Sequence, residues 1–340
     1  MNAKFHDKLN MLSKLSFAKA WNYFKLKKSF RTSKKTKKAI VKGRPFSISI
    51  EPTTACNLGC PECPSGLKQF TRKTGNLKQS LNKKIIDDLS KELFYLTFYF
   101  QGEPYINPNF LDFVSYAKSK KIYTATSTNA HFLTPKNSEK TVKSGLDRLI
   151  ISIDGSTQEV YEQYRKEGSI EKVIEGTRNI IEAKKKFKSR TPYVIFQFLV
   201  VKPNEHQIDE VRKLSKELGV DELKLKSAQV YNYKNGNPLI PDNEKYSRYK
   251  KQKDGTYILK NAMDDECWRM WQGSVITWDG KVVPCCFDKD AKHQFGDLSK
   301  SKFDDIWHNN QYQNFRNQLL KNRESIDICK NCSEGTKVWV

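Results

Sequence analysis

Three cysteines in one short loop constrain this chain more than any other feature of its sequence. The stretch 51–66 reads EPTTACNLGCPECPSG and holds Cys56, Cys60 and Cys63 in a C-x3-C-x2-C arrangement. Such close spacing can place three thiolates around one small metal cluster, whereas a four-iron cluster bound only by cysteine needs four ligands. The iron that lacks a protein ligand can then bind a small chelating molecule.

The residues around this loop predict where it lies in the fold. Residues 46–51 alternate apolar and polar side chains, as a half-buried strand does, and prolines and glycines make the rest a loop. The cluster would therefore lie at the C-terminal end of the first strand, where parallel α/β folds place their chemistry. Two alternatives stay open at this point, namely a zinc site with a fourth ligand from elsewhere and a redox-active Cys-x2-Cys pair.

The segment CNLGCPEC resembles the cluster loop of the radical S-adenosylmethionine (SAM) enzymes. In that family the open iron of a 4Fe-4S cluster binds the amino and carboxylate groups of SAM, and one electron cleaves SAM to a 5′-deoxyadenosyl radical. The resemblance implies the same cluster here, with Cys56, Cys60 and Cys63 as its ligands.

Strand-like and helix-like segments alternate after the loop, with five helical regions between six strands. The strands are predicted at 46–51, 96–101, 123–128, 149–153, 194–201 and 223–226. Right-handed connections would coil these units into a parallel sheet with helices outside. Together with the resemblance, this predicts an α/β fold, a partial (β/α)6 TIM-like barrel of the radical SAM type with a small C-terminal cluster-binding α+β extension. A flat doubly wound sheet remains the alternative.

Some local signals predict where individual elements begin and end. Thr134 followed by a proline marks a helix start, and Asn204 is expected to cap a helix that ends at Gly219. Residues 273–284 read as a hairpin, and residues 301–320 read as one helix.

Three strand ends resemble the segments that bind SAM in this family. The sequence QGEP is similar to the GGEP motif, whose backbone and acid meet the SAM amino group, which implies roles for Gly102 and Glu103. The SIDG segment implies that Ser152 pairs with a ribose hydroxyl. Arg165 can clamp the SAM carboxylate, with a solvent-facing helix position as the alternative. Asn129 is expected to shape the site.

Two further expectations concern neighbours of these residues. The backbone at Gln101 is less free than at the glycine of the family motif. The acid of the SIDG segment, Asp154, can instead cap the following turn.

A second group of cysteines lies near the C-terminus. Together with WDGKVVPCC and FGDL, it resembles the SPASM/Twitch auxiliary-cluster extension of radical SAM enzymes. The resemblance implies a second 4Fe-4S cluster, with structural zinc as the alternative. The expected ligands are Cys267, Cys285, Cys329 and Cys332, which leaves Cys286 as a buried spacer or an alternative ligand.

The resemblance divides the chain and predicts its function. The expected parts are a basic N-terminal arm at 1–44, a radical SAM core at 45–227, a linker or lid at 228–265 and an auxiliary cluster domain at 266–340. The predicted function is a radical SAM enzyme that abstracts hydrogen from a peptide side chain or from a small alcohol or sugar. Its reductant would be a flavodoxin or a ferredoxin. The rival class is a non-enzymatic zinc-binding adaptor whose basic arm contacts RNA or a membrane.

Charge is concentrated at the N-terminus. Residues 1–44 hold 14 Lys or Arg and one acid, so they carry +13 of the net charge of +23. One face of a predicted helix in this arm carries Phe17, Ala20, Trp21 and Phe24, which suits weak contact with a membrane surface. The plainer expectation is that this stripe packs on the domain.

No nucleic acid is expected as a partner. The chain shows no apolar signal core, and a cytoplasmic location is expected.

Overall fold

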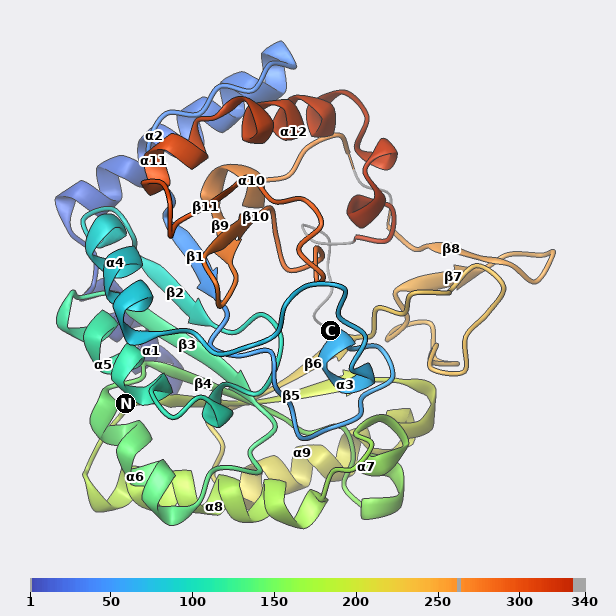
Figure 1. Cartoon of the computed structure of the whole chain (residues 1–340). Coiled ribbons are helices and arrows are strands. Elements are labelled where there is room, and N and C mark those ends of the chain that lie inside the picture. The colour runs from blue at the N-terminus through green and yellow to red at the C-terminus, as the bar shows by residue number, and fades with distance from the viewer. Residues whose placement is uncertain (1, 262–263, 333–340) are drawn as a thin grey trace.

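The computed structural model describes residues 2–261 and 264–332, and six parallel strands form its centre (Figure 1). They pair in the order in which they occur along the chain, from β1 to β6. Their bounds are β1 Ser47–Ile50, β2 Tyr95–Phe98, β3 Tyr123–Thr128, β4 Arg148–Ser152, β5 Tyr193–Val200 and β6 Glu222–Ser227. Because every connection steps in the same direction, right-handed crossovers bring all the helices to one face. The doubly wound alternative is therefore wrong.

The sheet is open and is extended on the β1 side. β6 forms one edge, and β1 pairs on its other side with β9 (Gly273–Ile276) instead of closing onto β6. This agrees with the predicted partial barrel. The predicted hairpin is present, since β9 pairs antiparallel with β10 (Lys281–Val283), which in turn pairs with β11 (Gly296–Asp297). The C-terminal extension thus continues the sheet of the core.

Gly273 makes this junction between the two parts of the sheet. A Cβ at this position would lie 1.6 Å from the carbonyl oxygen of Ser47. Only glycine lets the β9 backbone approach β1 this closely.

Helices cover the outer face of the sheet, except for the short α3, which lies in the cysteine loop (Figure 1). Their bounds are α3 Pro64–Leu67, α4 Gln79–Leu89, α5 Phe110–Ser119, α6 Pro135–Ser144, α7 Gln158–Tyr164, α8 Ile170–Lys186 and α9 Ile208–Glu217. Thr134 caps α6 by accepting a 3.3 Å hydrogen bond from the Asn137 N–H, as its sequence predicts. Short 3-10 turns lie at η1 (Pro104–Ile106) and η2 (Lys202–Gln207).

The predicted cap at Asn204 is wrong. Asn204 lies inside η2, and α9 begins only at Ile208. Its buried amide instead accepts from the Val201 N–H and donates to the carbonyl oxygens of Asp154 and Leu199. The side chain therefore ties the ends of β4 and β5 together. Gly219, with a φ of +72°, ends the helix as expected.

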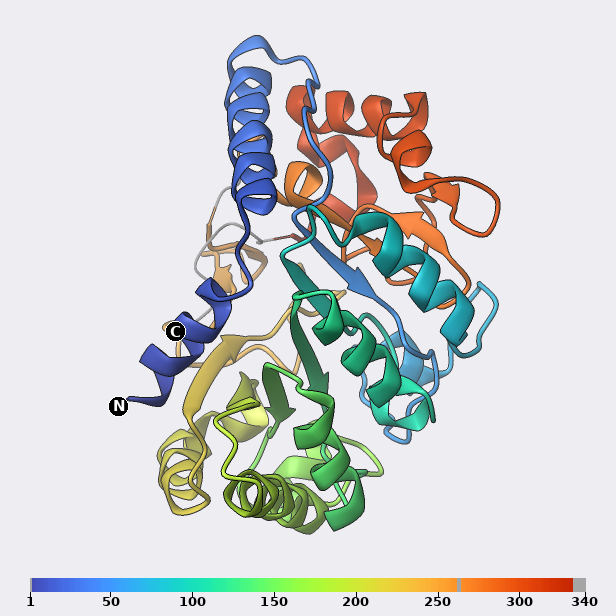
Figure 2. The ribbon, with the colours of Figure 1, turned by 90° about the vertical axis from the view of Figure 1, so that its left-hand side faces the viewer.

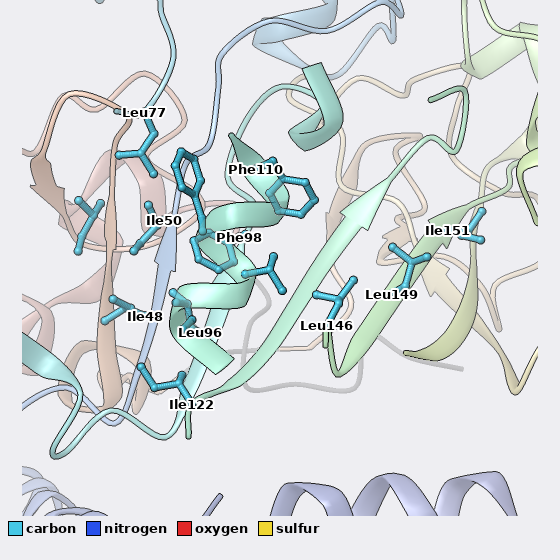
Figure 3. Close-up of a cluster of buried hydrophobic side chains, with 14 of the residues drawn as sticks. Ile48, Ile50, Leu77, Leu96, Phe98, Phe110, Ile122, Leu146, Leu149 and Ile151 are labelled. Atoms are coloured by element: carbon cyan, nitrogen blue, oxygen red, sulfur yellow. The ribbon is translucent and has the colours of Figure 1, made fainter. Parts of the chain in front are cut away.

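The core lies between the sheet and its helices (Figure 3). Ile48 and Ile50 of β1 and Leu96 and Phe98 of β2 are buried, and the ring of Phe98 packs against that of Phe110 of α5, with centroids 6.1 Å apart. The alternate residues of these strands are less buried and polar or aromatic. This alternation sends apolar side chains outward to the helices and leaves the concave face free to carry a site.

The C-terminal helices differ in one respect from the sequence prediction. The predicted single helix at 301–320 is two helices, α11 (Phe303–Trp307) and α12 (Asn310–Lys321). Asn309 interrupts them, because its side chain accepts a 2.8 Å hydrogen bond from the Tyr312 N–H and so begins a new helix. A four-residue helix, α10 (Arg269–Gln272), precedes β9. The turns η3 (Arg323–Ser325) and η4 (Asp327–Cys329) lead to the last cysteines.

Residues 228–261, within the span predicted as a linker or lid, include a two-stranded ribbon of β7 (Tyr249–Lys251) and β8 (Tyr257–Leu259). The ribbon projects from the body of the molecule in Figure 1. Residues 333–340 of the expected auxiliary domain and residues 262–263 of the expected linker lie outside the described residues.

Two helices form the N-terminal region, α1 (Ala3–Leu12) and α2 (Phe17–Thr36). They follow one another along one side of the molecule (Figure 2). The expectation that the aromatic stripe of α2 packs on the domain is wrong, because Phe17, Trp21 and Phe24 are all exposed. None of the described helices is both long enough and apolar enough to cross a bilayer.

Candidate active site

The cysteine loop begins where β1 ends and is fastened at both ends. Glu51 is fully buried and accepts two hydrogen bonds, of 2.8 and 2.6 Å, from the guanidinium of Arg72. Gly59 N–H donates to the Lys166 carbonyl oxygen at 2.9 Å. A Cβ on Gly66 would lie 2.5 Å from the backbone nitrogen of Cys60, so the loop folds tightly on itself. These contacts fix the backbone that carries the three cysteines.

Cys56, Cys60 and Cys63 line one cavity at the carboxyl ends of the strands. Burial raises the pKa of the Cys56 thiol to about 12 and also raises the pKa of Cys60. The sulfur of Cys60 lies 3.7 Å from Nη1 of Arg165, and the sulfur of Cys63 lies 3.7 Å from Oε1 of Gln101. Buried thiols of this kind need a cationic centre beside them before they give up their protons, as thiolate ligands do when they bind metal.

The QGEP segment lines the same cavity from the end of β2. Glu103 is buried and accepts hydrogen bonds from the hydroxyl of Thr128 at 2.7 Å and from the Asn129 N–H at 2.8 Å. Burial raises the pKa of its carboxyl to about 7. A buried carboxyl held in this way is suited to receive an ammonium group, which would restore its charged form.

The backbone conformation at Gly102, the second position of the QGEP segment, requires a glycine. Its φ is +72°, and a Cβ there would lie 2.4 Å from the Thr53 carbonyl oxygen. The preceding residue, Gln101, is buried and adopts no positive φ, so a glycine is not required there. Asn129 joins this part of the site to the cysteine loop, since its amide donates a 2.8 Å hydrogen bond to Oδ1 of Asn57.

The third predicted group comes from the end of β4 and the end of α7. Ser152 is buried and lines the cavity, and so does Arg165. Arg165 follows the last residue of α7, and its side chain is turned inward, so the solvent-facing alternative is wrong. Its Nε donates to Oδ2 of Asp154 at 2.5 Å. Although burial alone would lower the pKa of Arg165, Asp154 and Cys60 hold that pKa well above its usual range.

The prediction that Asp154 caps the following turn is wrong. Instead of capping the following turn, its Oδ1 accepts a 2.7 Å hydrogen bond from the Leu199 N–H, while Oδ2 pairs with Arg165. The side chain is fully buried. An acid directly after a buried strand was the available signal, but its partner lies eleven positions further along the chain.

The structure thus gathers the residues predicted to meet SAM around one cavity. Gly102, Glu103, Ser152 and Arg165 line it together with the three loop cysteines, and its volume is about 250 Å³. Their individual contacts with SAM stay predictions.

The four C-terminal cysteines predicted as ligands share a second, small enclosed cavity. It is lined by Cys267, Cys285, Cys329 and Cys332 and otherwise mostly by apolar side chains, which are Met270, Phe287, Phe315, Leu319 and Ile328. Burial raises the pKa of the Cys285 thiol well above its usual range and that of Cys329 to about 11. Nη2 of Arg323 lies 3.3 Å from the sulfur of Cys332. Four sulfurs and the two arginines Arg269 and Arg323, among apolar side chains, fit a buried anionic cluster.

Arg323 was missed in the sequence interpretation. It is buried, and it also donates a 2.7 Å hydrogen bond to the Glu266 carbonyl oxygen, beside Cys267. No local sequence pattern predicts that an arginine contacts these cysteines, because the contact depends on how η3 packs against residues 266–267.

The adjacent cysteines Cys285 and Cys286 differ in one of the cavities that they line. Cys285 lines the auxiliary cavity, whereas Cys286 lines the main cavity with the loop cysteines and is not among the described residues around the auxiliary one. Both residues also line a larger cavity with Cys267 and Arg323, so the role of Cys286 as a buried spacer or an alternative ligand stays a prediction.

The described part of the chain contains no preformed site for a single metal ion. Within residues 2–261 and 264–332, no three Cys, His, Asp or Glu side chains converge closely enough to hold one ion. A four-iron cluster spreads its ligands around a larger body than one zinc ion does, so the wider spacing is expected for a cluster. None of the eight cysteines, all of which lie in the described part of the chain, is in a disulfide.

Comparison with known proteins assigns both parts of the chain. The family model described as the radical SAM superfamily matches residues 50–222, and a model described as an iron-sulfur cluster-binding domain (SPASM) matches residues 267–333. These matches imply a SAM-binding 4Fe-4S cluster in the core and an auxiliary iron-sulfur cluster in the extension.

Two curated relatives match most of the chain. The chain is 25% identical over 315 residues to the tungsten-containing aldehyde ferredoxin oxidoreductase cofactor-modifying protein of Pyrococcus furiosus, covering 84% of this chain and 86% of the relative. It is 23% identical over 291 residues to the S-adenosyl-L-methionine-dependent 2-deoxy-scyllo-inosamine dehydrogenase of Niallia circulans, covering 84% and 92%.

A solved structure shares the fold. The crystal structure of anSMEcpe with bound AdoMet superposes with a TM-score of 0.61 at 18% identity and covers 85% of this chain and 84% of that one. At this identity the likeness concerns the fold alone.

Proposed function

This chain belongs to the radical SAM superfamily, and we propose that it oxidises a small polar molecule, such as an alcohol or a sugar, by removing two hydrogens from one site. It is an enzyme of SAM-dependent radical chemistry with an auxiliary iron-sulfur domain, so the zinc-binding adaptor class is set aside. The electron donor would be a flavodoxin or a ferredoxin.

One observation carries the choice of an oxidation. The four auxiliary cysteines line one small cavity together, and a cluster held by all four thiolates has no iron left open for a substrate. Such a group is suited to move electrons. The first cluster, held by Cys56, Cys60 and Cys63, would supply the electron for SAM cleavage, and the SAM-derived radical would take one hydrogen atom from the substrate. The auxiliary cluster, held by Cys267, Cys285, Cys329 and Cys332, would take up the remaining electron, and the second hydrogen would leave as a proton to solvent.

The protein's own residues bind and orient the reactants. Glu103 accepts the amino group of SAM, and the Arg165 guanidinium binds the SAM carboxylate. Ser152 offers its hydroxyl to the ribose. Asp154 positions Arg165, since it holds the guanidinium through a buried ion pair.

The remaining wall of the main cavity supports a polar substrate. Gln197 of β5, Lys226 of β6 and Gln229 line the cavity on the side of the last strands, and Lys289 lines it from the auxiliary domain. Amides and ammonium groups suit hydroxyl-bearing molecules. The relative that matches over 92% of its own length is named as a dehydrogenase of a small aminocyclitol, which supports the same class.

The test is a search for coupled products. Anaerobically reconstituted protein is given SAM, dithionite and pools of small alcohols, sugars and aminocyclitols, and 5′-deoxyadenosine is measured by mass spectrometry with the substrate that has lost two hydrogens. We expect both products in equal amounts with at least one pool. Turnover that occurs only with a peptide would contradict the small-molecule assignment and would favour peptide or protein modification.

A further inference from the structure

The N-terminal helices concentrate the exposed apolar side chains of this protein. Of the thirteen exposed large apolar side chains in the described part of the chain, eight lie between residues 5 and 24. On α2 the stripe consists of Phe17, Trp21 and Phe24, with exposed fractions of 85%, 53% and 56%. The rings of Trp21 and Phe24 are stacked, with centroids 5.6 Å apart. An isolated exposed side chain is ordinary, but a row at helical spacing marks a contact surface.

The preceding helix carries a similar row. Phe5, Leu9 and Leu12 of α1 follow the same spacing of four and three residues, and they are exposed by 51%, 43% and 61%. Leu15, in the link between the helices, is exposed as well. We call these seven side chains the arm stripe, comprising Phe5, Leu9, Leu12, Leu15, Phe17, Trp21 and Phe24.

The arm stripe is held outward because other faces of the two helices are docked on the enzyme. The amide of Asn22 donates a 2.8 Å hydrogen bond to the Arg44 carbonyl oxygen and accepts a 2.9 Å hydrogen bond from the Arg44 N–H. Phe30 is buried against Trp268 and Trp271, with ring centroids 5.4 and 5.0 Å away. Buried Lys19 donates a 2.6 Å hydrogen bond to the Lys121 carbonyl oxygen. The helix therefore cannot turn its stripe inward without breaking these contacts.

Positive charge accompanies the arm stripe. Lys28, Arg31 and Lys35 continue the row of Phe17, Trp21 and Phe24 at the same helical spacing, and all three are exposed. The single acid of this region, Asp7, is buried and paired with Arg148, so it does not offset the charge at the surface. The face thus combines aromatic side chains with uncompensated cations.

We propose that the α1–α2 face docks on the surface of a bilayer that contains anionic lipids. The aromatic rings and leucines enter the boundary between headgroups and acyl chains, and the lysines and arginine contact the lipid phosphates. The chemistry of both rows favours this partner. A nucleic acid satisfies the cations but leaves the leucines in water, and a second copy brings another +13 to the same face.

The test measures binding of the full-length, cluster-loaded protein to sedimented vesicles. One set of vesicles is phosphatidylcholine, and the other is phosphatidylcholine mixed with phosphatidylglycerol. We expect binding to the mixed vesicles that weakens with added salt, and little binding to phosphatidylcholine alone. We expect the affinity for the mixed vesicles to fall by about tenfold or more in each of two triple variants, F17S/W21S/F24S and K28E/R31E/K35E.

A matched control changes exposed apolar residues elsewhere. F187S/I258S removes two such side chains far along the chain from α1 and α2, and it should bind as the unchanged protein does. All variants should keep their iron and cleave SAM, which shows that they are folded.

Three results would overturn the proposal. Equal vesicle binding by the stripe variants and the unchanged protein removes the stripe from the contact. A dimer seen by light scattering that is lost in F17S/W21S/F24S assigns the face to a second copy. Binding to RNA or DNA that needs the cations but not the aromatic residues assigns it to nucleic acid.

Discussion

Asp154 and Arg165 form a buried ion pair at the carboxyl end of β4, with Oδ2 and Nε 2.5 Å apart. The same guanidinium lies 3.7 Å from the sulfur of Cys60. The pair therefore connects the end of the fourth strand to the cluster loop that follows the first. One arginine positions its charge toward both the predicted cluster ligand and the cavity.

Asp154→Asn should destabilise the protein by about 3 kcal/mol, because it leaves the Arg165 guanidinium in a mostly buried place without its counter-charge. The free energy of unfolding in urea measures the effect. Asp209→Asn is the control, since Asp209 is 90% exposed in its pair with Arg212 and should contribute less than about 1 kcal/mol. An equal loss of unfolding free energy in both variants would show that the buried ion pair contributes no more to stability than the exposed one.

The two cysteine groups should be separable by iron content and by reaction. Reconstituted protein should hold about eight irons, from two four-iron clusters. Replacing Cys56, Cys60 and Cys63 with alanine should remove about half of the iron and abolish SAM cleavage. The double variant Cys329→Ala with Cys332→Ala should lose the other half and still form 5′-deoxyadenosine under dithionite.

Cys286→Ala is the control for this pair of variants, because Cys286 lies outside both predicted ligand sets and its replacement should leave the iron content unchanged. Metal binding and folding are coupled, so each variant must be monodisperse. A folded double variant that turns over substrate normally would make the auxiliary cluster structural.

Gly66→Ala should prevent the first cluster from assembling, because the added Cβ would lie 2.5 Å from the Cys60 nitrogen and 2.8 Å from its carbonyl oxygen. We expect the iron content to fall by about half. Gly59→Ala is the control in the same loop, since its nearest atom is a side-chain carbon 3.3 Å away. Full iron in Gly66→Ala would mean that the loop has more room than its structure indicates.

Lys19 should make stability depend on pH in the alkaline range. Burial lowers its pKa from 10.5 to about 8. Between these values the unfolded chain holds the proton that the folded chain has released, so the free energy of unfolding rises with pH. The rise should be at most about 3 kcal/mol. It should be smaller in Lys19→Met than in the unchanged protein and unaffected by Lys35→Met, at an exposed site. Equal pH profiles for all three would refute the assignment.

Much of the fold could be predicted from the chain because the signals are local. Alternating strands, amphipathic helices and turn residues depend only on neighbours in sequence, and six strands with their helices were found at nearly their observed positions. The same is true of the cysteine loop, where three ligands lie within eight residues. In each case the physical constraint acts over a few residues.

Other features needed the tertiary structure because their partners lie far apart in the chain. The sequence indicated an acid at Asp154 and a cation at Arg165 but not that they pair. It grouped Phe17, Trp21 and Phe24 on one face but did not show that α2 docks through another face. Nothing near Arg323 in sequence marks it for Cys332.

The sequence by itself predicted the cysteine ligands and the positions of the strands, since these follow from spacing and periodicity along the backbone, and its motifs indicated the family. Only the tertiary structure decided which buried charges meet, which cavity each cysteine faces and which surface remains exposed. Those outcomes depend on packing between distant segments, where the cost of burying an unpaired charge or a misplaced side chain selects one arrangement.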